Sequence, residues 1–332
     1  MNTEDKMTPF ELIPPIKDYI WGGTRLRKEF GKSSGLNRLA ESWELSCHKD
    51  GLSVISGGNF DGMTLEDFLK AHPGAIRKNC SDYKEFPILI KLIDARENLS
   101  VQVHPDNEYA RRFEGDNGKT EMWYIVDCDE GAELIYGFKK KITRDEFCRA
   151  IAENTLLDKV NCVKVHKGDV FLIEPGTLHA IGKGILIAEI QQSSNVTYRV
   201  YDYGRVGIDG KPRDLHIGKA LDVTRLEPPS AKYGQPEIVR LPDAECRPLC
   251  GCEYFSTAKY DIFTQFSISN PDVFSHILVI DGEADIYSGS ENDQLPESGR
   301  IMHIKKGSSV FVPAGTDAIN IKGRCSIILT TI

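Results

Sequence analysis

The sequence has no long apolar stretch and no excess of basic residues. No segment reaches the ~18 consecutive apolar residues of a membrane-spanning helix, and the first residues carry acids and prolines where a signal peptide has basic and apolar regions. The chain has 49 acidic and 41 basic side chains, a formal net charge of −8, so no broad surface for DNA or RNA is expected. We therefore expect a cytoplasmic protein with no nucleic-acid or membrane partner.

The cysteines do not form the pattern of a disulfide framework. There are nine, an odd number, spread over 332 residues without a secretory context. Cys250 and Cys252 are the only tight pair, and no second Cys or His pair at zinc-finger spacing completes a tetrahedral site, so both are interpreted as packed thiols. Nucleotide-binding signatures are also missing, because Gly22-Gly23 and Gly57-Gly58 have neither GxGxxG nor P-loop spacing.

What the sequence does contain is an ordinary globular composition, with 40% hydrophobic and 27% charged residues. Most apolar runs are short and rich in Val, Ile, Phe and Tyr, as at 87–93, 122–126 and 185–191, and Gly, Asp, Asn or Pro stands at many of their ends. This pattern predicts a mainly β, antiparallel fold. Thr64 and Thr143 stand as N-caps before the clearest helical segments, so a few short helices are expected.

An internal repeat organises the chain. Residues 167–184 and 306–323 align with a constant offset of 139, and each copy has a Gly, an apolar strand, a Pro-containing turn and a Gly-Thr. Two copies of one β-barrel are therefore predicted. The segment 205–232 mixes Gly, Pro and charge, which indicates a connection between domains. We place a catalytic, metal-binding domain at 1–225 and a degenerate domain without metal at 226–332.

Two motifs resemble the signatures of the cupin superfamily. Gly168 and Gly176-Thr-Leu-His179 fit the second signature, with the proline displaced by one position to Pro175. Gln102-Val-His104, followed after an insertion by Glu121, represents the first signature. The resemblance implies two jelly-roll β-barrels of the cupin type.

Longer segments are similar to the type I phosphomannose isomerases of the short bacterial kind. The match is carried by LSVQVHP (99–105), GKTEMWYIV (118–126), EPGTLHAI (174–181) and YRVYDYGR (198–205), and WGG (21–23), AESWELS (40–46) and IQQSS (190–194) extend it. The resemblance implies an aldose–ketose isomerase that interconverts mannose 6-phosphate and fructose 6-phosphate through an enediol. It also implies one Zn²⁺ per chain and a sugar phosphate as the small-molecule partner, and we expect a monomer or weak dimer.

The same resemblance implies that the zinc ligands are Gln102, His104, Glu121 and His179. The chemistry of these residues agrees, because strand residues two apart share a face, and two neutral imidazoles, a carboxylate and an amide oxygen suit Zn²⁺. In the second copy of the repeat Ala318 stands where His179 would be, and Ser275 stands where Glu121 would be. The second domain is therefore expected to bind no metal.

Five further residues match the active site of the family. Arg199 and Lys119 are the predicted catalytic residues, and Arg199 suits either a phosphate or an enediolate. Lys91, Glu44 and Trp21 are predicted to bind the substrate. An ammonium group inside an apolar strand costs free energy unless it lines a cleft or has a partner, which makes Lys91 the most informative of the three.

One position departs from the family. Many members have Asp in the loop before the active-site arginine, where this chain has Asn195. An amide cannot act as a carboxylate base, so the base is predicted to be Lys119 or a zinc-bound water.

Two other functions are compatible with the motifs. Two histidines and a carboxylate also suit the iron of a non-haem cupin oxygenase. Against it stand Gln102 as a fourth ligand and the lysines and arginine of the matched segments. A cupin that binds a sugar phosphate without converting it is the third possibility.

Overall fold

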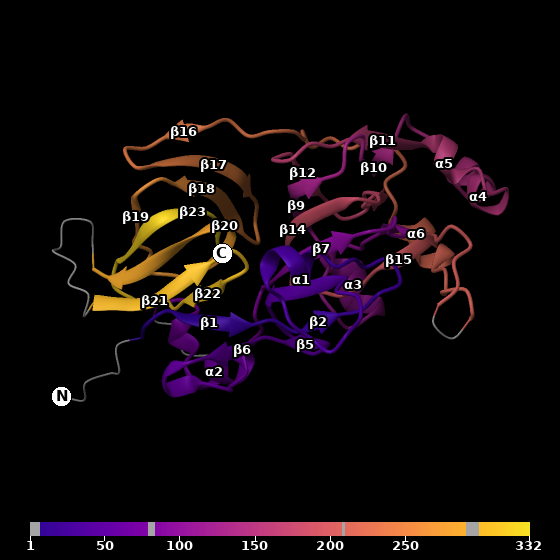
Figure 1. Cartoon of the computed structure of the whole chain (residues 1–332). Helices are drawn as coiled ribbons and strands as arrows, with labels where there is room; N and C mark the ends of the chain where they lie inside the picture. The colour runs from indigo at the N-terminus through magenta and orange to yellow at the C-terminus, as the bar shows by residue number, and fades with distance from the viewer. Residues whose placement is uncertain (1–6, 79–83, 208–209, 290–298) are drawn as a thin grey trace.

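The computed structural model describes residues 7–78, 84–207, 210–289 and 299–332. It confirms a mainly β fold with a few short helices (Figure 1). The helices are α1 (Arg25–Phe30), α2 (Leu65–Ala71), α3 (Asn107–Phe113), α4 (Arg144–Ala152), α5 (Leu156–Lys159) and α6 (Ile217–Val223), with 3₁₀ turns η1 (Gly58–Phe60) and η2 (Pro73–Ala75). Among the described residues no helix has the length and hydropathy to cross a membrane.

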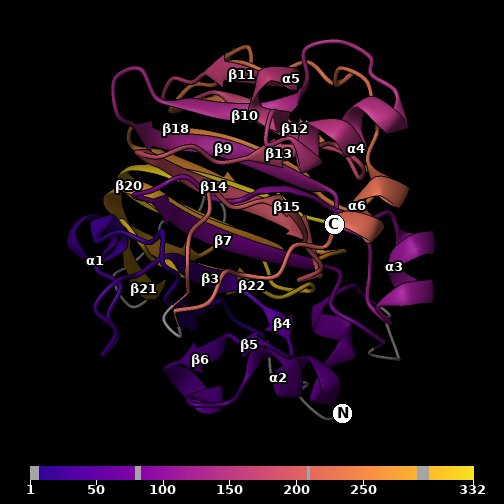
Figure 2. The same ribbon diagram turned by 90° about the vertical axis from the view of Figure 1, so that its right-hand side faces the viewer.

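Two sheets form the part of the molecule that carries the predicted site. The six-stranded sheet has the order β12 (Val170–Ile173), β9 (Glu121–Cys128), β14 (Ile185–Gln192), β7 (Ile88–Ala95), β3 (Glu41–Leu45) and β2 (Ile16–Lys17). The five-stranded sheet has the order β11 (Val160–Lys164), β10 (Glu133–Phe138), β13 (His179–Ala180), β8 (Val101–Val103) and β15 (Tyr198–Tyr201). Figure 2 shows β9, β14, β7 and β3 running side by side. A small pair, β4 (Cys47–His48) and β5 (Gly51–Leu52), stands apart from both sheets.

A third, ten-stranded sheet contains most of the C-terminal part. Its order is β16 (Val239–Arg240), β17 (Ala244–Gly251), β18 (Ser256–Ile262), β23 (Ile319–Thr331), β20 (Ser275–Ser288), β22 (Ser309–Val312), β1 (Phe10–Ile13) and β6 (Val54–Ser56), with β19 (Gln265–Ile268) on β23 and β21 (Arg300–Lys305) on β20. Strands β1 and β6 precede residue 225 but pair within this sheet. The domain boundary between residues 225 and 226 stays a prediction. The ten-stranded sheet includes residues from both sides of this boundary, because β1 and β6 complete it.

The six-stranded sheet lies between the other two and is buried on both faces. On β7, Leu92 belongs to an apolar cluster shared with Leu278 and Phe311 of the ten-stranded sheet. The adjacent Ile93 belongs to a different cluster, shared with Leu134 of the five-stranded sheet. Because both faces are covered, strands β7 and β14 are almost continuously apolar instead of alternating. Helices α4 and α6 pack on the outer face of the five-stranded sheet.

The helix starts follow the expected capping chemistry. The Thr64 Oγ1 atom accepts a hydrogen bond from the Asp67 backbone N–H at the start of α2. At the start of α4, Thr143 and Glu146 form a reciprocal capping box. Both N-caps predicted from the sequence are confirmed.

The internal repeat has the same local structure in both copies. Strand β12 pairs with β9 so that Ile173 lies opposite Glu121, and strand β22 pairs with β20 so that Val312 lies opposite Ser275. The turn glycines also correspond, since φ is 95° at Gly168 and 94° at Gly307. The strand pairing therefore supports the alignment of Ser275 with Glu121.

These two glycines differ in what surrounds them, which gives a matched test. A Cβ atom at Gly307 would lie 2.1 Å from the backbone oxygen of Phe30, whereas at Gly168 it would meet only the Gln235 side chain at 3.8 Å. Gly168→Ala should lower the free energy of unfolding by about 1–2 kcal/mol through backbone strain alone. Gly307→Ala should cost about 2 kcal/mol more, because the backbone of α1 must move. Denaturant unfolding measures both, and equal losses would contradict the prediction.

Candidate metal centre and active site

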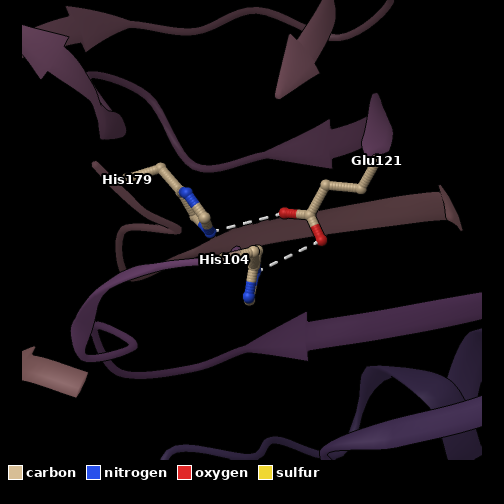
Figure 3. A group of neighbouring side chains, drawn as sticks. All are labelled: His104, Glu121 and His179. Carbon is tan, nitrogen blue, oxygen red and sulfur yellow. Dashed lines mark ion pairs between the residues drawn. The ribbon is translucent and has the colours of Figure 1, made fainter. Parts of the chain in front are cut away.

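Three buried side chains converge between the six-stranded and five-stranded sheets (Figure 3). Glu121 is the first residue of β9, His179 is the first residue of β13, and His104 directly follows β8. The Glu121 Oε1 atom lies 3.4 Å from Nε2 of His179, and Oε2 lies 3.5 Å from Nε2 of His104. The ligand atoms of the three residues lie within 4.8 Å of one another, so they could hold one metal ion.

Each imidazole is oriented by a backbone carbonyl. The Nδ1 atom of His104 lies 2.7 Å from the carbonyl oxygen of Val196, and Nδ1 of His179 lies 2.8 Å from that of Thr177. A carbonyl oxygen only accepts, so Nδ1 carries the proton in both rings and donates it. Nε2 is then the unprotonated nitrogen in each ring and points toward Glu121, as in a metal-ligating histidine.

The carboxylate of Glu121 has surroundings that suit a metal ligand. Neither oxygen accepts a hydrogen bond of good geometry from the described residues, although Nζ of Lys119 lies 2.8 Å from Oε2. Burial, reinforced by Glu189, raises the pKa of Glu121 to about 7. Burial also lowers the pKa of His179 to about 4 and that of His104 well below its usual range. Two lone pairs and a carboxylate facing one another in the protein interior fit a bound cation.

Gln102 stands beside this group, as the sequence predicted. It lies directly opposite His179 in the pairing of β13 with β8 and directly opposite Arg199 in the pairing of β15 with β8. Its amide nitrogen is 3.4 Å from Nε2 of His179. The amide oxygen and nitrogen exchange places when the side chain flips, so Gln102 can present its oxygen to the same ion.

A polar pocket opens next to the buried group. Gln102 and Lys119, which contact His179 and Glu121, are part of its wall and connect the two. Its other lining residues are Tyr19, Trp21, Glu41, Lys91, Ile93, Leu99, Ser100, Ile181, Glu189, Asn195, Thr197, Arg199 and Arg213. Trp21, Lys91, Lys119 and Arg199, all predicted from the sequence, are thus brought together around one cavity.

Two lysines and two acids alternate on the pocket side of the six-stranded sheet. The Nζ atom of Lys91 lies 3.4 Å from Glu189 and 3.5 Å from Glu41, and Nζ of Lys119 lies 3.7 Å from Glu189. Burial disfavours the charge of Lys91, but Glu41 and Glu189 outweigh it and raise its pKa. Burial likewise opposes ionisation of Glu189, but Lys119 and Lys91 lower its pKa overall. The opposite charges around Lys91 and Glu189 thus offset the cost of burying these two groups.

Arginines occupy another side of the same pocket. Arg199 is half-buried, its Nη1 donates to the carbonyl oxygen of Asp214, and its Nε has no hydrogen-bond partner among the described residues. Burial and the neighbouring Arg213 lower the pKa of Arg199. Arg213 is held by a bidentate contact with Asp202. An anion entering the pocket would satisfy the unpaired donor and offset the repulsion between the two guanidinium groups.

Glu44 does not lie in this pocket, and the assignment from the sequence is revised. Strand β3 has a bulge here, since Trp43 pairs with Lys91 and Leu45 pairs with the adjacent Ile90. Glu44 is the extra residue, and its carboxylate forms a buried ion pair with Lys32 at 2.6 Å. Glu41, three residues earlier in the same motif, lines the pocket instead.

Glu189, Glu41 and Arg213 are pocket residues that the sequence reasoning missed. Glu189 was detectable, because an acid in the apolar run 185–191 is as unusual as Lys91 in 87–93, and the two lie directly opposite each other in the pairing of β14 with β7. Nε1 of Trp123 donates to Glu189 at 2.9 Å. Arg213 gave no such signal, because it lies in a Gly- and Pro-rich connection.

These observations define the class of protein as a mainly β-sheet protein with a polar pocket beside a buried His-Glu-His group that could bind a metal. Residues 10–136 match the type I phosphomannose isomerase catalytic domain, and residues 247–332 match the mannose-6-phosphate isomerase cupin domain. The chain belongs to the type I phosphomannose isomerase family, which confirms the resemblance in its sequence, and it is an isomerase.

The similarity to individual relatives extends over nearly the whole chain. A probable mannose-6-phosphate isomerase of Bacillus subtilis is 38% identical over 97% of this chain and 98% of its own length. A mannose-6-phosphate isomerase of Streptococcus mutans is 37% identical over 89% of this chain and 92% of its own. The crystal structure of the mannose 6-phosphate isomerase from Bacillus subtilis superposes with a TM-score of 0.88 at 34% identity, covering 98% of this chain and 100% of that one.

Metal content tests the buried group. We expect one metal ion per native chain, and His179→Ala should lose it because only one imidazole, the carboxylate and the weak amide donor remain. His276→Ala is the matched control, since His276 is equally buried but bonds to Ser309 Oγ at 2.8 Å in the ten-stranded sheet. It should keep the ion. The metal-to-protein ratio from elemental mass spectrometry, with circular dichroism to verify folding, checks both.

The second copy of the repeat gives the reciprocal experiment. Ala318→His restores an imidazole there but leaves Ser275 where a carboxylate is needed, so the metal-to-protein ratio should stay at one. Two ions per chain, in the native protein or in this variant, would show that the C-terminal sheet also holds metal.

Proposed function

We propose that the chain interconverts mannose 6-phosphate and fructose 6-phosphate by proton transfer through an enediol, with one Zn²⁺ bound to Gln102, His104, Glu121 and His179. The observation that carries the proposal is the pair of unprotonated imidazole nitrogens aimed at the buried carboxylate of Glu121, next to a pocket lined by lysines and arginines. The names of the relatives support the same substrate.

The arginines and lysines of the pocket suit a sugar phosphate. A phosphate dianion needs fixed donors, and Arg199 offers an Nε–H that no described residue accepts, while Asp202 holds Arg213 in place. The hydroxyl groups of the sugar can exchange hydrogen bonds with Glu41, Ser100 and Glu189, which line the same cavity. These contacts fix the orientation of the substrate relative to Gln102 and Lys119.

Isomerisation moves one proton between C2 and C1 and stabilises negative charge on the neighbouring oxygens. A bound Zn²⁺ would supply that stabilisation as a Lewis acid. Lys119 is the proposed proton carrier, because it lines the pocket and its Nζ contacts both Glu121 and Glu189. Asn195 also lines the pocket, but an amide takes no proton at neutral pH. No redox cofactor is required by this chemistry.

A coupled assay tests this function. The purified protein should convert mannose 6-phosphate, with glucose 6-phosphate as the control substrate. EDTA treatment should abolish activity, and added Zn²⁺ should restore it. Unchanged turnover after verified metal removal would refute the role of zinc, and turnover of the glucose ester alone would indicate a different sugar-phosphate isomerase.

The same samples separate the alternatives. An iron oxygenase would contain iron and consume oxygen, whereas a binding protein would hold the hexose phosphate without converting it. The cytoplasmic location and the monomer or weak dimer stay predictions.

Asn195 allows a test of the departure from the family. Its Nδ2 donates to Oδ2 of Asp50 at 2.8 Å, so Asn195→Asp would place two carboxylates face to face at the pocket. We expect no gain in kcat and a several-fold rise in KM, because the added charge repels the phosphate. The double variant Asn195→Asp/Asp50→Asn restores the hydrogen bond with reversed polarity and should recover part of the KM. A rise in kcat in the single variant would show that a carboxylate base acts from this position.

A further inference from the structure

Four side chains form one row across the pocket side of the six-stranded sheet. In the strand pairing Trp43 of β3 lies opposite Lys91 of β7, and Lys91 lies opposite Glu189 of β14. Glu189 in turn lies opposite Trp123 of β9. Residues directly opposite one another in a sheet share a face, so a tryptophan stands at each end of the row and an ion pair lies between them. Both tryptophans are fully buried.

Each tryptophan donates its indole N–H to a carboxylate that lines the pocket. Nε1 of Trp43 lies 2.7 Å from Oε2 of Glu41, which is two residues earlier on the same face of β3. Nε1 of Trp123 lies 2.9 Å from Oε2 of Glu189. An indole N–H only donates, and a buried one needs an acceptor. Each carboxylate is therefore held by a ring that is packed in the protein interior.

Lys91 lies between the two carboxylates and in close contact with neither. Its Nζ atom is 3.5 Å from Oε2 of Glu41 and 3.4 Å from Oε1 of Glu189. It also lies 5.0 Å from the centre of the Trp43 ring. An ammonium group and a carboxylate that are free to move close to about 2.7–2.9 Å. The indole hydrogen bonds oppose this closure, because they hold each carboxylate back from the lysine.

We propose that Trp43 and Trp123 are positioning residues, each of which holds one pocket carboxylate so that Lys91 stays midway between the two. Neither tryptophan is part of the pocket wall, so both act through Glu41 and Glu189. The inference rests on the proposed function, in which Lys91 binds the substrate. It gives two residues of the protein interior a role in fixing the charges of the pocket before a substrate arrives.

The two tryptophans differ in what lies beyond the carboxylate that each one holds. Oε1 of Glu189 also lies 3.7 Å from Nζ of Lys119, the proposed proton carrier. Glu41 has no contact of this kind among the described ion pairs. Loss of the Trp43 hydrogen bond should therefore affect substrate binding alone. Loss of the Trp123 hydrogen bond should also affect proton transfer.

The hydrogen bonds are tested first, without any assay of activity. The chain has three tryptophans, so a proton–nitrogen correlation spectrum of the full-length protein should show three indole signals, which Trp→Phe variants assign. Glu41→Gln should shift the Trp43 signal upfield, and Glu189→Gln should shift the Trp123 signal upfield, because a neutral amide is a weaker acceptor than a carboxylate. Indole signals that these two variants leave unmoved would overturn the proposal.

The positioning is tested next by the kinetics of isosteric variants. Benzothienylalanine, in which sulfur replaces the indole N–H, keeps the size of the ring and can be introduced at one position at a time. At position 43 it should raise the KM for mannose 6-phosphate several-fold and leave kcat within about twofold. At position 123 it should raise KM and also lower kcat roughly tenfold. Trp43→Phe and Trp123→Phe should act in the same directions, with an added loss of stability from the cavity.

Tyr136→Phe is the matched control. Tyr136 is buried, and its hydroxyl donates to the carbonyl oxygen of Leu172 at 2.9 Å. The variant thus removes one buried aromatic donor without releasing a pocket carboxylate. It should lower the free energy of unfolding and keep both kinetic constants. If neither isosteric variant changes KM or kcat more than Tyr136→Phe does, the tryptophans have only a structural role.

Metal content controls for a second contact of Trp123. Its ring packs edge-to-face on His179, with the ring centres 5.3 Å apart. The isosteric variant keeps this contact, so its metal-to-protein ratio should equal that of the native protein. A lower ratio would show that the ring acts on His179 and would refute its action through Glu189.

These results separate the two proposals. A native protein that does not convert mannose 6-phosphate would refute the proposed function, while the indole signals would still decide whether the tryptophans hold the carboxylates. An active native protein whose isosteric variants match the control would refute the positioning alone.

Discussion

The burial of both faces of the six-stranded sheet is the constraint on which the site depends. A charged side chain on such a sheet has no water to reach, so it must have a partner or face a cavity. Glu44 pairs with Lys32 on one face, and Asp94 accepts a hydrogen bond from the backbone of Arg25. On the opposite face Lys91 and Glu189 lie directly opposite each other and border the pocket. The charges are compensated among themselves, which keeps them fixed before a substrate arrives.

The two copies of the repeat show how the same strand pairing can be used with different side chains. The register that places Glu121 opposite Ile173 places Ser275 opposite Val312. In the second copy the neighbouring His276 bonds to Ser309, whose hydroxyl donates to the carbonyl oxygen of Glu44. The polar residues of the second copy thus contact the N-terminal strand β3. In the first copy, by contrast, the polar residues on these strands face a pocket.

Local sequence information predicted the strands, the helix caps and the convergence of the four proposed ligands, because each depends on spacing within a short segment or on a family motif. Lys91 was detectable since one charge in an apolar run is costly wherever it lies. Glu44 and Glu41 could not be told apart, because a bulge in β3 decides which of them faces the pocket. The pairing of β1 with β22 was equally invisible, since it joins residues about three hundred positions apart through shape and apolar burial alone.

The C-terminal sheet contributes to the site although none of its described residues lines the pocket. Tyr254 is its contact with Asn107, and Asn107 and Gln192 hold the backbone on either side of Lys119. The apolar cluster against which Tyr254 packs includes Met122 and Leu92, which lie on the strands that carry Glu121 and Lys91. Loss of this cover would expose one face of the six-stranded sheet and remove the polar contact that positions the loop. The position of Lys119 therefore depends on a sheet that donates no proposed ligand, which gives a physical reason for a second, degenerate copy of the repeat to persist.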